Sequence, residues 1–229
     1  MKIVMIGGSG AVGGHAVRSM LSLPQVDKLT LLGRRKMDSI SDDRVVQHTI
    51  NIFATASYVD LLPGHDAAIC TLGVGQPSKV SKEEFIRIDK QAVLDFATRC
   101  KAAGVRHFEL LSSVGISSKS KSFYLRTKGE LVDDMERLNF ERFSVFKPSM
   151  ILTPTNRYGL SQAITLKVWP LLSMVLVGGL KKYRGVDVDV LGESITANLL
   201  TVGEGVEYLD WSDFMDLVAN SNLKTHGSD

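Results

Sequence analysis

The chain has 229 residues, of which 44% are hydrophobic and 23% charged, and its formal net charge is +2. These values are typical of a globular protein with one α/β domain and a small appendage, and they give no strong field for nucleic acid or an anionic membrane. Only two cysteines are present, so a disulfide framework is excluded as an organising feature and a reducing, cytoplasmic location is expected.

A glycine cluster follows the apolar run at residues 1–6. Gly7, Gly10 and Gly13 stand three residues apart, and a helical pattern begins near Ala11. This spacing predicts a strand, a tight loop and a helix whose free N–H groups can bind a diphosphate. A plain glycine-rich turn in an α/β protein is the alternative interpretation, because the glycine pattern alone has low specificity.

The second predicted strand, 28–33, ends at two basic residues. An NAD-selective dinucleotide fold usually has an acidic side chain at this point, where it binds the ribose 2′-hydroxyl. Here Arg34 and Arg35 follow instead. Two guanidinium groups attract a 2′-phosphate, so the sequence favours NADP(H) over NAD(H). The alternative interpretation is a solvated basic turn.

Strands and helices alternate as far as residue 147. Ser81 and Glu84 form a capping box, and Gly104 ends the helix that follows. This alternation predicts an α/β protein with a doubly wound, parallel, Rossmann-like sheet. The predicted strands after the first two are 45–50, 65–73, 105–111 and 143–146. Helix 81–104 is predicted after strand 65–73, and helix 122–138 after strand 105–111.

The ends of these strands indicate where a ligand binds. Ligands of open α/β sheets lie outside the carboxyl ends of the strands, so Leu72 and Gly73 should lie beside a cofactor. Asn51 ends the strand 45–50, where its side chain can reach an adenine amino group.

Beyond Pro148 the alternation weakens. We therefore divide the chain into a nucleotide-binding core at 1–155, a C-terminal substrate-side segment at 156–219 that is integrated with the core, and a disordered tail at 220–229. Within this part we predict strands at 186–190 and 206–209 and helices at 160–176, 194–202 and 212–219.

The most apolar window of the chain is 168–180. It is too short to span a bilayer and contains Pro170, Gly178 and Gly179, so a buried helix or a pocket wall is predicted and stable membrane insertion is not. No signal peptide is expected, because Met1 already lies at the edge of the first strand.

Ser113, Tyr124 and Lys128 are the candidate catalytic residues. Tyr124 and Lys128 are four residues apart on the predicted helix 122–138, so both side chains project from one face. A phenol has a reference pKa of about 10, and a nearby ammonium favours the phenolate, as general acid–base catalysis requires. Ser113, at the end of strand 105–111, can donate a hydrogen bond to a carbonyl oxygen. Such a Tyr–Lys pair often arises by chance. The assignment therefore depends on its position, one element after a strand that ends in two serines and in a chain that has the glycine loop.

Other chemistries find less support. The histidines His15, His48, His65 and His107 belong to different elements, so no metal site is predicted. Ser113 lacks the Gly-x-Ser-x-Gly elbow of serine hydrolases. The balanced charge and the few aromatic residues beside the basic ones argue against nucleic-acid binding.

The sequence resembles the short-chain dehydrogenase/reductase superfamily. Within it, the chain is similar to the atypical NAD(P)-binding branch with Tat-interacting oxidoreductase-like and NmrA-like members. The similarity covers residues 1–155 well and is thin afterwards, apart from 183–186. The segments that carry it are 32–36, 85–89, 104–113, 124–130 and 143–148.

The resemblance implies roles for the matching residues. Tyr124 would be the proton donor in carbonyl reduction, Lys128 would bind the nicotinamide ribose, and Ser113 would orient the carbonyl. Ser112 is the alternative to Ser113, because the spacing from serine to tyrosine is shorter here than in the best-known branch. Asn51 departs from the family, in which aspartate is commoner at the adenine pocket. The predicted cofactor-binding residues are Gly7, Ser9, Gly10, Ala11, Val12, Gly13, Arg34, Arg35, Asn51, Leu72, Gly73, Tyr124, Lys128 and Pro148.

Two functions remain open at this stage. The first is an NADPH-dependent oxidoreductase that reduces a carbonyl or a related group on an apolar small molecule. The second is a regulatory protein that binds NADPH and acts through protein contacts with little or no turnover. The sequence leaves open a homodimer or a protein partner.

Overall fold

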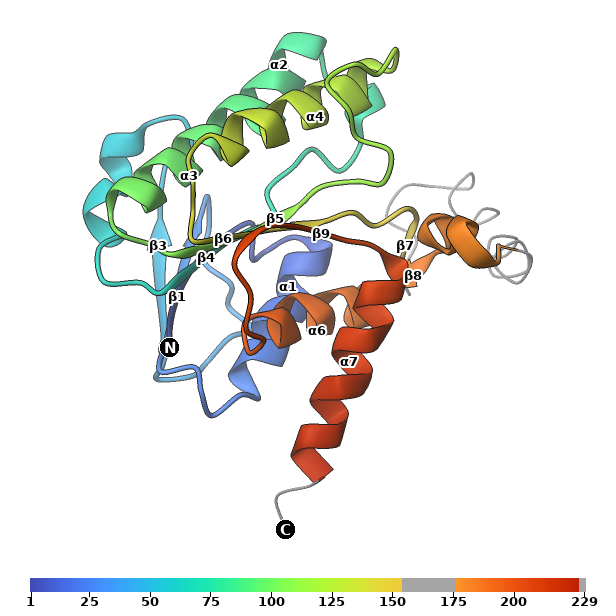
Figure 1. Ribbon diagram of the computed structural model, residues 1–229. Helices are drawn as coiled ribbons and strands as arrows, with labels where there is room; N and C mark the ends of the chain where they lie inside the picture. Colours follow the sequence, from blue (N-terminus) through green and yellow to red (C-terminus); the bar gives the residue numbers. More distant parts are fainter. Residues whose placement is uncertain (154–175, 227–229) are drawn as a thin grey trace.

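The computed structural model describes residues 1–153 and 176–226 (Figure 1). Its centre is a seven-stranded sheet in the order β3-β2-β1-β4-β5-β6-β9, and every pair of neighbours is parallel. The predicted doubly wound parallel sheet is therefore confirmed. The strands are β1 (Lys2–Ile6), β2 (Lys28–Gly33), β3 (Val45–Thr49), β4 (Ala67–Cys70), β5 (His107–Leu111), β6 (Arg142–Phe146) and β9 (Gly205–Leu209).

Helices cover both faces of the sheet. In Figure 1, α2, α3 and α4 lie above the sheet, and α1, α6 and α7 lie below it. The helices are α1 (Ala11–Leu21), α2 (Lys82–Ile86), α3 (Val93–Ala102), α4 (Phe123–Glu136), α6 (Val188–Asn198) and α7 (Trp211–His226). Short pieces complete the described chain: β7 (Ile151–Leu152), β8 (Val186–Asp187), and the helical turns η1 (Thr55–Ser57), η2 (Val59–Leu61), η3 (Pro77–Lys79), η4 (Arg87–Ala92) and η5 (Gly178–Tyr183).

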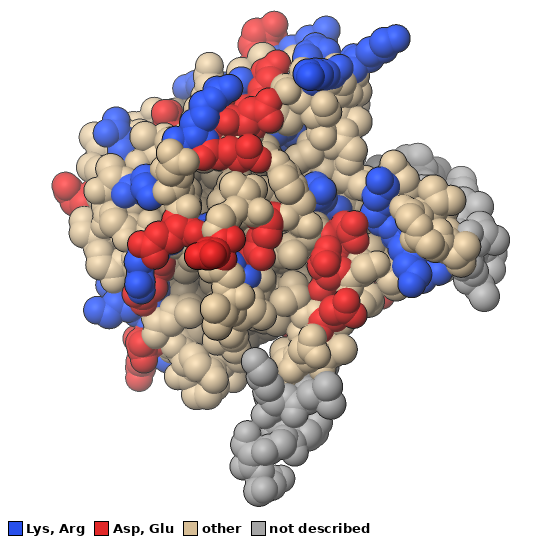
Figure 2. Space-filling model, viewed as in Figure 1, with Lys and Arg blue, Asp and Glu red and all other residues tan. Residues whose placement is uncertain are grey.

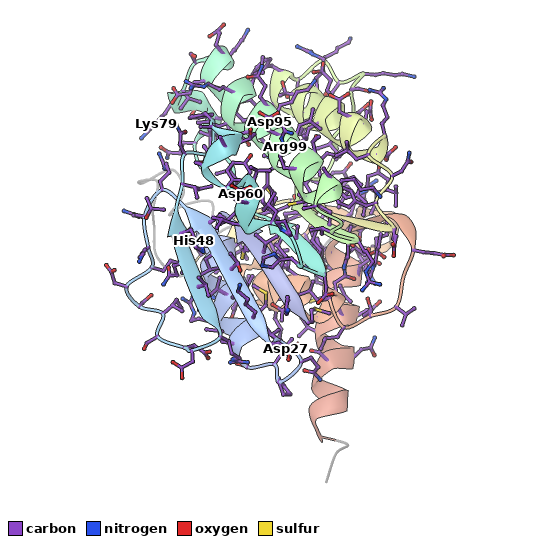
Figure 3. All side chains as sticks on the ribbon, turned by 90° about the vertical axis from the view of Figure 1, so that its left-hand side faces the viewer. Asp27, His48, Asp60, Lys79, Asp95 and Arg99 are labelled. Atoms are coloured by element: carbon purple, nitrogen blue, oxygen red, sulfur yellow. The ribbon has the colours of Figure 1, made fainter. Side chains whose placement is uncertain are left out.

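The alternation of side chains along β1 builds two cores. Ile3 and Met5 join the cluster on the α1 side, whereas Val4 and Ile6 join the cluster on the α3 side. Successive residues of a strand point to opposite faces, so a strand covered on both faces must be apolar throughout. Figure 3, a view from the β3 edge, shows side chains filling the space between the sheet and the helices.

The predicted helix 81–104 is interrupted. It begins as expected, because the Ser81 hydroxyl accepts a hydrogen bond from the Glu84 N–H at 3.1 Å, and it ends before Gly104, which has a φ of +86°. Between α2 and α3, however, the six residues of η4 form a π-helical turn. The prediction of one regular α-helix was wrong here. Apolar residues continue to recur through the wider turn, so the sequence pattern does not reveal the interruption. The turn carries Asp89 into the interior.

The C-terminal part differs from its predicted boundaries. The strand predicted at 186–190 stops at Asp187, because Val188 already begins α6 with Asp187 as its N-cap residue. Consequently α6 replaces the helix predicted at 194–202. Residues 220–226, predicted as part of a disordered tail, belong to α7, in which neither proline nor glycine interrupts the helix before its last residue, His226. The helix predicted at 160–176 lies outside the described residues.

Helix α6 packs closely on α1. Gly192 permits this approach, because a Cβ there would lie 2.8 Å from the backbone nitrogen of Ala16. The Thr196 hydroxyl also donates a hydrogen bond to the Ala16 carbonyl oxygen at 3.3 Å. Helix α6, which follows the first six strands of the sheet in the chain, therefore completes the helical layer that contains α1.

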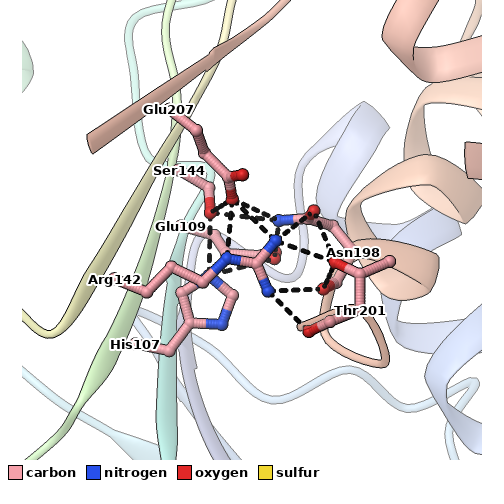
Figure 4. A network of polar contacts seen from close by, with 7 residues as sticks. All are labelled: His107, Glu109, Arg142, Ser144, Asn198, Thr201 and Glu207. Carbon is pink, nitrogen blue, oxygen red and sulfur yellow. Dashed lines mark hydrogen bonds and ion pairs between the residues drawn. The ribbon is translucent and has the colours of Figure 1, made fainter. Parts of the chain in front are cut away.

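A buried polar network joins the last strand to the sheet (Figure 4). The Arg142 guanidinium lies 2.7 Å from the Glu207 carboxylate and donates to the Asn198 side chain at 2.7 Å. Asn198 in turn donates to Glu109 at 2.8 Å and to Ser144 at 3.0 Å. These contacts connect α6 to the middle of β5, β6 and β9, and so anchor the C-terminal part to the sheet.

Candidate functional site

The candidate site lies at the carboxyl ends of the strands, where the sheet order changes direction between β1 and β4. Ligands bind at such switch points in open α/β sheets. A cavity of about 730 Å³ occurs here, which we call the central cavity. Its lining residues include Gly10, Ala11, Val12, Thr71, Leu72, Gly73, Val74, Gly75, Asp89, Ser112, Tyr124, Lys128, Ser149, Met150 and Thr153.

The glycine loop is shaped by close backbone approaches. Gly7 has a φ of +92°, and a Cβ there would lie 2.6 Å from the backbone nitrogen of Leu72. A Cβ at Gly13 would lie 2.3 Å from the Gly7 carbonyl oxygen. Neither position can accept a side chain without movement of the backbone, so these glycines are required by the packing of the loop.

The first turn of α1 is open to an anion. Gly10 is the N-cap residue with extended backbone and no side-chain cap, and the first turn contains no acidic residue. Gly10, Ala11 and Val12 line the central cavity. Unpaired N–H groups and the positive end of the helix dipole suit a pyrophosphate here, so the residues present fit a dinucleotide.

A second cavity of about 590 Å³ adjoins the first. Residues 72–75 line both cavities, so the loop after β4 is their common wall. Arg34 lines the second cavity, in which the Arg87 guanidinium lies 3.8 Å from the centroid of the Phe53 ring. Arg35 borders a small hollow together with Gly8 and Ser9. Arg34 therefore borders the second cavity, and Arg35 borders a hollow at the glycine loop.

Asn51 and Pro148 do not line either cavity. The Asn51 side-chain oxygen accepts a hydrogen bond from the Phe53 N–H at 3.0 Å, and Ile52 and Phe53 line the second cavity in its place. Pro148 is buried, and its carbonyl oxygen accepts from the Val114 N–H at 2.9 Å. Their predicted contacts with a cofactor gain no support from this geometry.

Tyr124 and Lys128 lie on the face of α4 that borders the central cavity. The helix begins at Ser122, whose hydroxyl accepts a hydrogen bond from the Leu125 N–H at 3.5 Å. The Tyr124 ring packs on Phe85 with 5.5 Å between the ring centroids. Helical spacing and this contact together aim the predicted pair at the cavity.

Sequence reasoning missed Asp89. Its side chain is 2% exposed, and one carboxylate oxygen lies 2.9 Å from the Lys128 ammonium. Burial acts to lower the pKa of Lys128, but the charge and hydrogen bond of Asp89, together with Tyr124 and Cys70, raise that pKa above its ordinary value. A signal was present, because Asp89 stands four residues after Phe85 on the apolar face of the predicted helix.

The structure distinguishes the two serines. Ser112 lines the central cavity and is 7% exposed, and its hydroxyl has no hydrogen-bond partner within the part of the chain that the structure describes. Ser113 does not line the cavity, and its hydroxyl lies 3.5 Å from the Val114 carbonyl oxygen. A buried hydroxyl without a partner costs free energy unless a ligand satisfies it. The geometry therefore favours Ser112 as the residue that meets a ligand.

Over residues 1–153 and 176–226, no group of three His, Cys, Asp or Glu side chains is arranged to hold a metal ion, and His48 lies on the outer strand β3 (Figure 3). Acidic and basic side chains are interspersed on the face shown in Figure 2. None of the described helices combines the length and apolar character needed to cross a bilayer.

The switch-point cavities and the glycine loop at the start of α1 define a dinucleotide-binding protein of the Rossmann type. The family model described as NAD(P)H-binding matches residues 7–144, and the chain belongs to this NAD(P)H-binding family.

Named relatives agree with this family. Protein HTATIP2 of Rattus norvegicus is 35% identical over 153 residues, and the match covers 66% of this chain and 63% of the relative. The mitochondrial protein FMP52 of Meyerozyma guilliermondii is 30% identical over 154 residues, with 66% of each chain covered. The chain thus matches less than two thirds of the length of these relatives. The resemblance to the Tat-interacting branch is confirmed.

Solved structures agree in fold. MoeE5 in complex with UDP-glucuronic acid and NAD has a TM-score of 0.69 at 14% identity, covering 91% of this chain and 75% of that one. The oxidoreductase ylbE from Lactococcus lactis has a TM-score of 0.67 at 14% identity, covering 98% and 97%. At these identities the likeness concerns the fold alone.

Proposed function

We propose that the protein is an NADPH-dependent oxidoreductase of the short-chain dehydrogenase/reductase type that reduces a carbonyl or a related group on an apolar small molecule. One observation carries the proposal: Tyr124, Lys128 and Ser112 line the same cavity as the first turn of α1. A proton donor, a fixed cation and a free hydroxyl therefore surround the space beside the pyrophosphate site.

The bound cofactor would supply a hydride to the carbonyl carbon. The Tyr124 hydroxyl donates a proton to the carbonyl oxygen, so the product is the alcohol. The Lys128 ammonium stabilises the phenolate that remains and can hold a ribose hydroxyl. Ser112 donates a hydrogen bond to the same carbonyl oxygen and so orients the substrate.

The preference for NADPH rests on the two arginines after β2. In the described residues neither Arg34 nor Arg35 forms an ion pair with a carboxylate, so both guanidinium groups are available to a 2′-phosphate. The segment between β2 and residue 37 also contains no acidic side chain that could bind a 2′-hydroxyl.

NADPH oxidation with a panel of aldehydes, ketones and quinones tests the proposal. The Tyr124→Phe variant should lose about 100-fold or more in turnover, because it lacks the proton donor, while NADPH binding changes little. If NADPH binds tightly, no substrate is reduced and the variant behaves like the wild type, the regulatory alternative replaces this proposal.

We also propose a cytoplasmic location, on the basis that Cys70 and Cys100 are buried free thiols. The FMP52 relative carries the word mitochondrial in its name. Fractionation of cells that express the tagged chain distinguishes the two locations.

A further inference from the structure

Asp89 has a different partner on each carboxylate oxygen. One oxygen lies 2.9 Å from the Lys128 ammonium, and the other accepts a hydrogen bond from the Val74 N–H at 2.7 Å. Both charged side chains are almost fully buried, at 6% exposure for Lys128 and 2% for Asp89. A buried pair of this kind is costly to break, because the remaining charge would have no partner.

The π-helical turn η4 brings this carboxylate to the cavity. The next residue, Lys90, forms ion pairs with Glu130 at 3.0 Å and Asp134 at 3.4 Å, both on α4. Two consecutive residues of η4 therefore bind α4, Asp89 through Lys128 and Lys90 through Glu130 and Asp134. The Asp89–Lys128 pair borders the central cavity, whereas both ion pairs of Lys90 lie outside its lining. Single π turns inside helices are frequent at functional sites.

The loop at residues 72–75 completes the arrangement. This loop is the wall between the two cavities, and the Val74 N–H ties it to Asp89. Gly73 lies directly against the ion pair, since a Cβ there would be 3.0 Å from an Asp89 carboxylate oxygen and 3.8 Å from the Lys128 nitrogen. The loop at residues 72–75 and Lys128 thus share the Asp89 carboxylate.

We propose that Asp89 is a positioning residue that holds Lys128 charged and fixes it to the cofactor loop in a single geometry. The consequence for turnover rests on the proposed function, whereas the effect on Lys128 itself does not. Asp89 acts through its neighbours, so a substitution at Asp89 should affect both the loop at residues 72–75 and Lys128 on α4.

The titration of Lys128 is the direct test, and it needs no substrate. The groups that act on its charge are Asp89, Tyr124 and Cys70. Because burial favours the neutral amine and Asp89 opposes it, Asp89→Asn should move the titration of Lys128 to lower pH by about one unit or more. Glu130→Gln is the matched control, because it removes an ion pair between η4 and α4 that does not involve Lys128, and Lys90 keeps its second ion pair with Asp134.

The measurement follows the ε-carbon resonance of Lys128 against pH in carbon-13-labelled lysine protein without cofactor, with Lys128→Arg for assignment. Wild type and Glu130→Gln should titrate together, and Asp89→Asn should titrate at lower pH. Equal titration in all three overturns the proposal. If Asp89→Asn does not fold, Asp89→Glu, which keeps the charge but lengthens the side chain, must keep the high titration point.

Turnover and NADPH binding give the second measurement. Asp89→Asn keeps an acceptor for the Val74 N–H, so NADPH affinity should change less than about threefold while the alkaline limb of kcat moves to lower pH. Asp89→Ala removes both contacts and should weaken NADPH about tenfold as well. An unchanged alkaline limb in Asp89→Asn contradicts the proposal. A wild type without turnover contradicts the proposed function only.

Discussion

Gly13 sits against the carbonyl oxygen of Gly7, where a Cβ would lie only 2.3 Å from that oxygen. The same Cβ would lie 2.7 Å from the Thr71 hydroxyl, so the helix start, the glycine loop and the end of β4 meet at this one position. The close approach sets how far the first turn of α1 reaches into the central cavity.

Gly13→Ala should therefore both destabilise the protein and weaken NADPH. Overpacking against backbone costs about 1–3 kcal/mol, and displacement of the helix start should raise the NADPH dissociation constant about tenfold. Urea unfolding and fluorescence titration measure the two effects. Gly14→Ala is the control, because its nearest Cβ contact is an ordinary 3.6 Å and alanine suits a helix interior. Equal behaviour of the two variants would refute this account.

Replacement of Arg34 and Arg35 by serine should weaken NADPH far more than NADH. Two lost charge-assisted hydrogen bonds correspond to about 10- to 100-fold in affinity, and only NADPH carries the 2′-phosphate. Isothermal titration with both cofactors measures the ratio. Equal losses for NADPH and NADH would show that the arginines form a solvated turn.

The sequence was informative wherever one physical rule acts locally. Apolar runs of strand length, the capping residue Ser81 and the glycine spacing predicted the parallel sheet and the phosphate loop, since each depends on neighbouring residues. The position of Tyr124 and Lys128 on one helix face followed from the helical period in the same way.

Features that depend on distant segments were missed. The π turn at η4 has no sequence rule of its own, so the partner of Lys128 remained hidden although Asp89 interrupts an apolar face. The choice between Ser112 and Ser113 depends on which side chain faces the cavity where the chain leaves β5, and a shift of one residue reverses the side. Beyond residue 148, short elements take their limits from packing on α1, which no local pattern shows.

Ser112→Ala should abolish most turnover without destabilising the protein. The Ser112 hydroxyl is buried without a partner inside the described chain. The substitution therefore removes an unsatisfied polar group and should cost little stability. Loss of the carbonyl-orienting hydrogen bond should lower kcat about 100-fold. Ser113→Ala should leave kcat within about threefold, because that side chain does not line the cavity. Steady-state kinetics decide between them, and the opposite order would restore Ser113 as the orienting residue.

Glu109 should make the stability of the fold depend on pH. Burial raises its pKa from 4.5 to about 8, so the folded protein keeps a proton that the unfolded chain releases above pH 4.5. The contribution of Glu109 is therefore fully present below pH 4.5 and is lost as the pH rises through about 8.

Its network neighbour acts at lower pH. Burial lowers the pKa of His107 from 6.5 to about 4, so the contribution of neutral His107 is lost as the pH falls below 6.5. Above pH 6.5, the pH dependence of stability from these two residues should come mainly from Glu109.

Glu109→Gln should remove the alkaline dependence, because glutamine is a neutral substitute that still accepts from Asn198. Between about pH 6.5 and 8 the wild type should lose about 2 kcal/mol of unfolding free energy relative to the variant, since one proton is released on unfolding in this window. Urea unfolding at several pH values measures the difference. Parallel pH profiles for the wild type and Glu109→Gln would mean that Glu109 is already ionised in the folded protein, held by Arg142 across the network.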